Sequence, residues 1–230
     1  MPLWSGDEEL WSLIRRELFT AVVGDALDKL GHERQFLPPR LRPLRADMVV
    51  VGRAMTVLEA DIEVAARIDT DLAELAAPFG LMFRALDDLR PNEVYLCSGA
   101  APRYALWGEL MSIRARQCGA SGAVVDGYSR DTHGILALNF PVFSHGSYAQ
   151  DQGLRGKVVD FRCGLEVEGV RIDDGDIVLG DIDGVLIVPQ AVEVACITAA
   201  LEKVRGENLV RQALLEGMTT AEAFRKFGIM

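Results

Sequence analysis

The chain of 230 residues lacks any hydrophobic run close to the ~20 residues that a membrane-spanning helix needs. Its first residues include Asp7, Glu8 and Glu9, so they have neither the basic nor the apolar region of a signal peptide. No stretch rich in proline, glycine or serine separates one part of the chain from another. We therefore expect a single domain that resides in the cytoplasm and has no membrane segment.

Cysteine and histidine are scarce, and neither type shows the spacing of a metal site. The four cysteines are Cys97, Cys118, Cys163 and Cys196. They contain no C-x-x-C pair, which indicates reduced thiols in the core. His133 follows Asp131 by two residues, and we expect it in a loop or at the surface.

An excess of basic charge is also missing. The net charge of −10 argues against a nucleic-acid partner, which selects for basic patches. Neither a G-x-G-x-x-G motif nor a P-loop follows an expected strand, which argues against nucleotide or S-adenosylmethionine binding. An anionic small molecule stays compatible with this composition, because a site can be locally positive in an acidic protein.

A strand–helix–strand pattern occupies the middle of the chain. Residues 94–97 and 123–125 are short apolar runs, which predict two buried strands. A helix is expected between them, ended by Gly119 and Gly122. Its predicted apolar stripe consists of Trp107, Met111, Ala115 and Cys118. The two strands should run parallel, because such crossovers form βαβ units.

This geometry predicts a site where the helix begins and the second strand ends. Gly108 opens the helix without a side chain, and the first amides of a helix attract anions. Those amides belong to Glu109, Leu110 and Met111. Arg130-Asp131, just after the second strand, should return to the same edge of the sheet. The alternative for Arg130-Asp131 is a surface ion pair or a turn.

The residue types at this edge suit a bound 2-oxo acid. Arg130 has a planar cationic fork that matches carboxylate or enolate oxygens. Asp131 and Glu109 are hard oxygen ligands, which favour Mg²⁺ or Mn²⁺ over zinc.

Helices are expected at both ends of the chain. Ser5–Glu8 predicts a capping box for a first helix, and Thr20 predicts the cap of a second helix that ends at Gly31. Helical patterning returns over 191–215 and 220–226. The expected parts of the domain are N-terminal helices over 1–34, an α/β core over 35–190 and C-terminal helices over 191–230.

The core pattern alternates helices and strands before it becomes rich in strands. Strand is expected over 48–51 and 54–58, followed by a helical region over 62–89 that is broken near Pro78-Phe79-Gly80. Later strands are expected over 158–163, 165–172, 177–179 and 185–188. Asp181 and Asp183 predict a tight turn, because the spacing of a calcium loop is absent. The whole pattern fits mixed α/β layers.

The stretch from Gly108 to Asp131 resembles the signature of the RraA-like family. This family includes the class II 4-hydroxy-4-methyl-2-oxoglutarate / 4-carboxy-4-hydroxy-2-oxoadipate aldolases and the regulator of ribonuclease activity A. Further points of resemblance are Phe19-Thr20-Ala21, Asp25-Ala26-Leu27 with Gly31, Gly52–Val57, Pro141-Val142-Phe143, Gly169-Val170, Gly175–Val178, Gly180–Val185 and Val188-Pro189. The resemblance implies a β/β/α sandwich of the swivelling-domain type, assembled as homotrimers or homohexamers with sites at subunit interfaces.

The resemblance also implies roles for individual residues. The amides of Leu110 and Met111 would bind the substrate carboxylate, and Arg130 would stabilise an enolate. Asp131 would hold the metal, and Glu109 would hold the waters of that metal. In the family, a Glu from the C-terminal helix of a neighbouring subunit completes the site.

Glu207 is the best match to that completing Glu. The implied reaction is a metal-dependent retro-aldol cleavage of a 4-hydroxy-2-oxo acid to pyruvate plus a second oxo acid, with oxaloacetate decarboxylation as a side activity. Two alternatives stay open: a non-catalytic regulator of a ribonuclease that binds a protein partner, and a lyase of the same fold for another hydroxy or sugar acid. Tyr128 and Ser129, just before Arg130, replace the small apolar residues expected in the best-known aldolases, which would indicate a substrate with a different distal group.

Overall fold

The computed structural model describes residues 3–68 and 73–228. It forms two compact units. The helical unit consists of Met1–Glu33 with Val192–Met230, and the α/β unit consists of Arg34–Ala191. The limits of the α/β unit lie close to the expected core over 35–190. That the helices and the core form a single domain stays a prediction.

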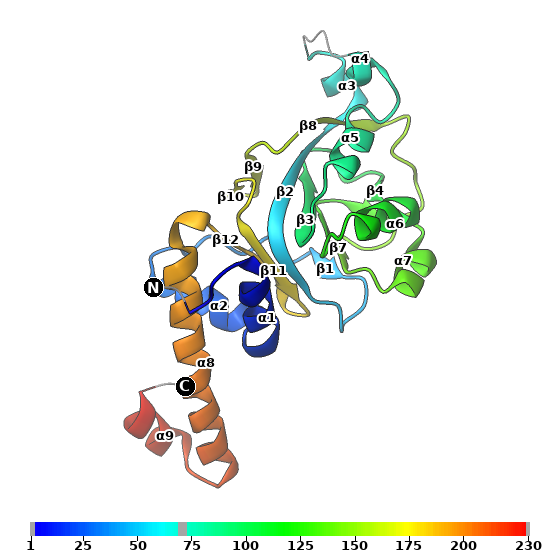
Figure 1. Cartoon of the computed structure of the whole chain (residues 1–230). Helices are drawn as coiled ribbons and strands as arrows, with labels where there is room; N and C mark the ends of the chain where they lie inside the picture. The colour runs from blue at the N-terminus through cyan, green and yellow to red at the C-terminus, as the bar shows by residue number, and fades with distance from the viewer. Residues whose placement is uncertain (1–2, 69–72, 229–230) are drawn as a thin grey trace. The chain divides into compact units, whose positions relative to one another are not determined.

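An eight-stranded mixed sheet organises the α/β unit (Figure 1). The strand order is β1-β7-β5-β3-β2-β11-β12, with β8 also paired to β2. The strands are Arg42–Pro43 (β1), Val50–Asp61 (β2), Glu93–Ser98 (β3), Gly122–Val125 (β5), Val142–Ser144 (β7), Gly156–Phe161 (β8), Ile177–Asp181 (β11) and Gly184–Val188 (β12). Strands β2, β3, β5 and β7 run parallel to one another, so the predicted parallel pair β3 and β5 is confirmed.

Strand β3 is buried on both faces, which explains its unbroken apolar sequence. Tyr95 and Cys97 enter a cluster that packs against the neighbouring helices. Val94 and Leu96 point to the opposite face and join a second cluster, made by the strands on the other side. The alternation follows from the period of two along a strand.

Strand β2 is one long strand, whereas the sequence predicted two pieces separated at Gly52-Arg53. Gly52 lies inside this strand. The position requires glycine, because a Cβ there would lie 2.1 Å from the carbonyl oxygen of Asn92. The first half of β2 pairs with β11 and the second half pairs with β8. Strands β1 and β12 form the two edges of this strand order. Arg42 of β1 donates to the carbonyl oxygens of Ile182 and Asp183, in the turn before β12, at 3.1 and 2.7 Å, so the sheet is nearly closed.

The described part of the α/β unit contains five α-helices, and Figure 1 shows α5, α6 and α7 on one side of the sheet. They are Ile62–Ala65 (α3), Ala73–Ala76 (α4), Met82–Asp87 (α5), Glu109–Gln117 (α6) and Thr132–Leu138 (α7). The predicted break is confirmed, because Phe79 and Gly80 have positive φ angles of 66° and 58°. The prediction of a helical region that is continuous up to that break is wrong, because residues 66–68 are not helical. Residues 69–72 of the predicted region lie outside the described residues.

Short hairpins follow in the second half of the unit. The predicted strand 165–172 is a hairpin of Leu165–Val167 (β9) and Val170–Ile172 (β10), turned by Glu168 and Gly169 with positive φ angles. The predicted tight turn at Asp181 is confirmed, because its side chain accepts a hydrogen bond from the Asp183 amide at 2.9 Å.

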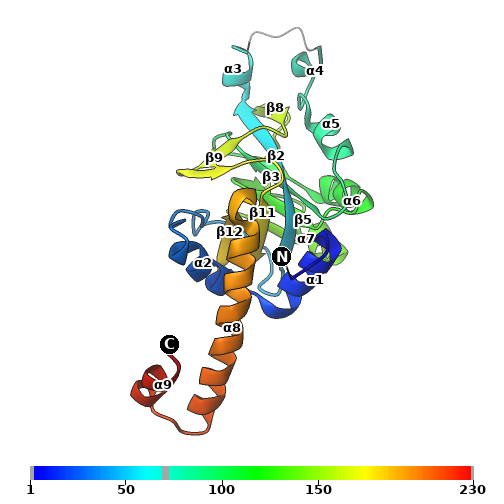
Figure 2. The same cartoon turned by 60° about the vertical axis from the view of Figure 1, so that its left-hand side comes forward.

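The helical unit contains Asp7–Glu17 (α1), Thr20–Lys29 (α2), Glu193–Leu215 (α8) and Thr220–Phe227 (α9), and a short 3₁₀ turn, Gln190–Val192, precedes α8. Figure 2 shows that α9 lies beside the C-terminal part of α8. No helix within the described residues is long and apolar enough to span a membrane.

Two predicted caps of this unit are wrong. Ser5 bonds the carboxylate of Glu9 at 2.7 Å, and the N-cap residue of α1 is Gly6. Thr20 lies inside α2, whose N-cap residue is Phe19. The reciprocal capping box occurs instead at α9, between Thr219 and Glu222.

Candidate active site

Two short parallel strands bring the helix start and the Arg-Asp pair together. Ala105–Trp107 (β4) pairs with Tyr128–Ser129 (β6), with Trp107 opposite Ser129. The amide of Arg130 then donates to the carbonyl oxygen of Trp107 at 2.9 Å. The predicted proximity is confirmed, and so is the helix start at Gly108, but Trp107, predicted on the apolar stripe of the helix, belongs to strand β4.

The start of α6 is fixed by a buried tryptophan. Trp107 is 1% exposed and packs against the Tyr95 ring at a centroid distance of 4.9 Å. Its indole N–H donates to the Ser112 hydroxyl at 2.7 Å, and that hydroxyl donates to the Gly108 carbonyl at 3.1 Å. The amides of Glu109, Leu110 and Met111 form the first turn, where a helix offers no internal acceptor.

Gly108 lies against both residues of the Arg-Asp pair. A Cβ at Gly108 would be 2.9 Å from Asp131 Oδ2 and 3.7 Å from Arg130 Cγ. The missing side chain therefore leaves open space beside the carboxylate and the first amides of α6.

Asp131 holds a left-handed backbone conformation, with φ 56° and ψ 34°. This conformation costs a residue with a side chain roughly 1 kcal/mol, although Asp tolerates it better than most. Asp131 precedes α7, yet its side chain makes no capping hydrogen bond. The carboxylate is 46% exposed and is available to a ligand.

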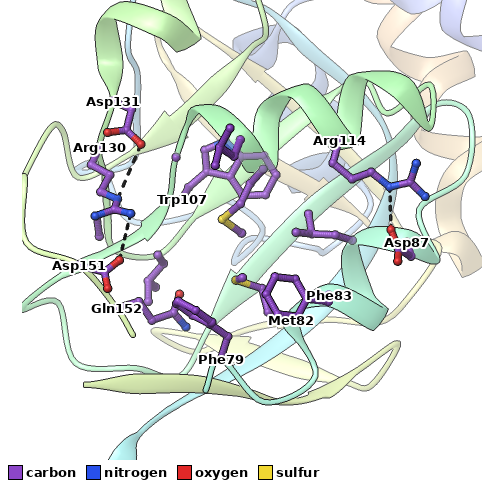
Figure 3. Close-up of a pocket in the computed structure, with 16 residues that line it drawn as sticks. Phe79, Met82, Phe83, Asp87, Trp107, Arg114, Arg130, Asp131, Asp151 and Gln152 are labelled. Atoms are coloured by element: carbon purple, nitrogen blue, oxygen red, sulfur yellow. Dashed lines mark hydrogen bonds and ion pairs between the residues drawn. The ribbon is translucent and has the colours of Figure 1, made fainter. Parts of the chain in front are cut away.

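Arg130 lies between two carboxylates (Figure 3). Its Nη2 is 3.1 Å from Asp151 Oδ1, and its Nε is 3.7 Å from Asp131 Oδ2. The side chain is 39% exposed, so part of the guanidinium faces the open space. The pair of acids orients the fork without using all of its donors.

Asp151 and Gln152 were missed by the sequence analysis. They reach the site because their loop runs beside β4, where the Ala105 amide donates to the Gln150 carbonyl at 2.8 Å. This contact joins residues 45 positions apart and leaves no local motif, so no sequence signal marks it.

Gln152 connects the site to a buried acid. Its side-chain amide donates to Glu59 Oε2 at 2.6 Å, and both residues are buried. Glu59 is 1% exposed, and burial raises the pKa of its carboxyl group to about 8. At neutral pH Glu59 is therefore mostly protonated and uncharged.

One end of a cavity of about 410 Å³ is lined by Gly108, Arg130, Asp131, Asp151 and Gln152. The middle of the cavity is apolar and includes Phe79, Met82, Phe83 and Met111. At the far end, Arg114 Nε contacts Asp87 Oδ1 at 2.7 Å. Figure 3 shows the Arg130 end and the Arg114 end on opposite sides of the apolar stretch.

The RraA-like family, described as Aldolase/RraA, matches residues 20–187. The chain belongs to this family. A relative from Halalkalibacterium halodurans, provisionally named 4-hydroxy-4-methyl-2-oxoglutarate aldolase, is 29% identical over 214 residues, which cover 91% of this chain and 90% of the relative. The resemblance drawn from the Gly108–Asp131 stretch is therefore confirmed.

Solved structures confirm the expected α/β fold of the RraA-like family. An uncharacterised protein from Pseudomonas syringae pv. tomato is 24% identical with a TM-score of 0.82, over 99% of this chain and 98% of that one. Streptomyces coelicolor RraAS2, described as an unusual member of the RNase ES inhibitor RraA protein family, is 21% identical with a TM-score of 0.74. That match covers 91% of this chain and 99% of RraAS2.

The residues of the first turn of α6 that belong to the RraA-like signature do not all face the cavity in the same way. Met111 lines the cavity, and Leu110, which is not on the predicted apolar stripe, lines it while staying 80% exposed. Glu109 points its carboxylate toward α7, where a Cβ on Gly134 would be 2.1 Å from Glu109 Cδ. Among the described residues, no group of three metal-ligating side chains is formed.

Residues expected to report the distal substrate group lie outside the cavity lining. Tyr128 packs its ring against His145 and Tyr148, and Ser129 is buried beside the Ser144 hydroxyl at 3.2 Å. His133 is exposed on α7.

Glu207 belongs to the helical unit, not to the unit that carries the cavity. It lies on α8 and contacts Lys203 at 3.4 Å. Its role as a metal residue of a neighbouring subunit stays a prediction.

Proposed function

We propose that the protein is a divalent-metal-dependent aldolase that cleaves a 4-hydroxy-2-oxo acid through a pyruvate enolate. One observation carries the proposal: the open first turn of α6, Arg130 and Asp131 meet at one end of a single cavity. Membership of the RraA-like family and the aldolase name of the H. halodurans relative agree with this chemistry.

The first turn of α6 would bind the substrate carboxylate. The amides of Leu110 and Met111 supply N–H donors at the positive end of the helix dipole. Gly108 itself has no side chain to block the approach of the carboxylate to these amides, and a Cβ there would lie 2.9 Å from Asp131 Oδ2.

Arg130 would stabilise the charge that develops on the C2 oxygen. When the C3–C4 bond breaks, its electron pair forms the enolate, and the C4 hydroxyl becomes a carbonyl group after loss of its proton. Asp151 holds one nitrogen of the guanidinium, so the fork is preorganised before charge develops. No lysine lines the cavity within the described residues, so the geometry favours an enolate over a Schiff base.

The acidic residues fit an oxygen-preferring cation. Asp131 presents a half-exposed carboxylate oxygen to the space above Gly108 that a Cβ would fill. An oxygen-only donor set suits Mg²⁺ or Mn²⁺. Glu109 and, from a second copy, Glu207 are the further oxygen donors of the proposal, which therefore includes a homo-oligomer. When bound, such an ion polarises the keto group as a Lewis acid.

The test is pyruvate release from 4-hydroxy-4-methyl-2-oxoglutarate and from oxaloacetate, with Mg²⁺ or Mn²⁺ and again with chelator. Oxaloacetate belongs in the test because its decarboxylation passes through the same enolate. Release should require the metal and should be abolished by Asp131→Ala. Asp47→Ala, an exposed acid outside the cavity, is the control and should keep full activity.

Two other results would redirect the assignment. Activity retained in Asp131→Ala would remove Asp131 from the mechanism. No release from either compound, from folded protein with metal, would favour the binding-protein function or a lyase with another substrate.

A further inference from the structure

The cavity that contains Arg130 continues into an apolar stretch with no role in the chemistry above. Its wall consists of Phe79, Met82, Phe83, Leu86 and Leu106. Phe79 and Phe83 contact each other edge to face at a centroid distance of 5.8 Å, and Met82, Leu86 and Leu106 are buried. This surface lies beyond the end of the cavity where the proposed function places the 2-oxo acid.

Charged side chains in the lining are either paired or anionic. Asp87 contacts Arg114 Nε at 2.7 Å at the far end, in an ion pair whose two side chains are 65% and 47% exposed and therefore hydrated. Arg130 has two acids of its own and, in the proposed function, faces the keto end of the substrate. A second carboxylate on the substrate would therefore lose hydration against aromatic rings and would meet only a cation that already has an acidic partner.

Gln152 adds an uncharged polar group to the lining of the cavity. Its amide donates to Glu59, and burial keeps Glu59 uncharged at neutral pH. The pair is neutral, so it gives no electrostatic reason for an anionic distal group to bind.

We infer that the substrate carries an apolar substituent, aliphatic or aromatic, on C4 in place of a second carboxylate. This inference rests on the proposed function. Retro-aldol cleavage of such a compound transfers the electron pair of the C3–C4 bond to the enolate. The C4 hydroxyl loses its proton to give an apolar aldehyde or ketone, and protonation at C3 gives pyruvate.

The first test measures binding without cleavage, because the probes lack a 4-hydroxyl group. Isothermal titration with Mg²⁺ present compares 2-oxo-4-phenylbutanoate with 2-oxoglutarate, which share the 2-oxo acid end. The phenyl compound should bind at least about tenfold more tightly, the scale on which apolar pockets discriminate. Tighter binding of 2-oxoglutarate would overturn the inference.

The second test compares cleavage of 4-hydroxy-2-oxo-4-phenylbutanoate and 4-hydroxy-4-methyl-2-oxoglutarate by kcat/KM. Phe83→Arg places a cation on the apolar wall at a residue that is 59% exposed, so folding should be kept. It should lower the ratio of phenyl to carboxylated substrate by about tenfold or more. Ile182→Arg, 56% exposed and outside the cavity, should leave the ratio unchanged.

Oxaloacetate decarboxylation separates failure of the inference from failure of the proposed function. If oxaloacetate is decarboxylated and the carboxylated aldol is preferred, only the apolar substituent is wrong. If oxaloacetate and both aldols are inert, the proposed function fails. If Phe83→Arg changes the oligomeric mass while the substrate ratio stays constant, the wall is an interface between copies, which would also overturn the inference.

Discussion

Two arginines of the α/β unit lie among carboxylates, but their surroundings differ. Arg162 is 19% exposed and contacts Glu93 at 2.9 Å, Asp174 at 3.2 Å and Asp88 at 2.5 Å. Arg130 is 39% exposed and has two acids, at 3.1 and 3.7 Å.

The difference separates a structural cluster from a candidate site. Hydrogen bonds from Arg162 to Glu93, and further contacts with Asp88 and Asp174, raise the pKa of the Arg162 guanidinium. Its donors are used inside the protein, so the cluster joins β8 to the start of β3 and has little capacity for a ligand. Arg130 keeps donors open toward a cavity, and this spare capacity makes it a candidate for binding.

The largest expected effect on stability comes from Arg162→Ala. Removing the cation leaves partly buried Glu93, Asp88 and Asp174 without compensation, so the free energy of unfolding should fall by about 3–5 kcal/mol. Urea unfolding at pH 7 measures the loss. Arg171→Ala is the matched control, because its ion pair with Asp173 is 80% exposed on the arginine side and should contribute little to stability. Similar losses in both variants would contradict the structural role of Arg162.

Arg130→Ala should have the opposite profile. We expect kcat for oxaloacetate decarboxylation to fall roughly 10²–10³-fold, because a preorganised donor to the enolate oxygen is lost. The unfolding free energy should change by less than about 1 kcal/mol, since the ion pairs of Arg130 are exposed. A change confined to KM would show that Arg130 binds substrate and transition state equally.

Two buried glutamates extend the comparison, because Glu93 contacts the Arg162 guanidinium whereas Glu59 contacts only the neutral side-chain amide of Gln152. The pKa of Glu59 is raised to about 8 by burial, from 4.5 in an unfolded chain. The unfolded state therefore loses its proton first, and stability falls as pH rises between these two values. Glu59→Gln should remove this decline and make the protein more stable than wild type at pH 9, by several kcal/mol.

Urea unfolding of Glu59→Gln at pH 4 and pH 9 tests that sign. The two proteins should differ little at pH 4, where both side chains are neutral. Glu93→Gln is the control with opposite sign, because it deprives Arg162 of an anion and should destabilise at pH 7. Equal stability of Glu59→Gln and wild type at every pH would show that Glu59 titrates normally.

The smallest expected effect belongs to Asp151→Asn. This change keeps the shape of the side chain but weakens its hold on Arg130, so kcat/KM should fall about fivefold, or roughly 1 kcal/mol. Asp173→Asn, which faces the exposed Arg171, is the control and should not alter activity. An unchanged kcat/KM in Asp151→Asn would show that Arg130 needs no second acid for its orientation.

Much of the fold could be predicted from local patterns. The apolar runs at residues 94–97 and 123–125 are the buried parallel strands β3 and β5, because an apolar run between turn residues has few other stable arrangements. The one-residue shifts of the helix caps arise because Ser5 and Thr20 had equally good local alternatives. Trp107 was assigned to the helix because an apolar residue before Gly108 fits a helix or a strand equally well.

The sequence by itself determined the chemical inventory: a helix start at Gly108, Arg130, Asp131 and the family to which the chain belongs. Only the tertiary structure decided what surrounds them. Asp151, Gln152 and Glu59 reach the site through strand pairing and loop contacts between residues far apart in the chain. Long-range contacts of this kind depend on how the whole sheet closes, so no periodicity or spacing within the sequence records them.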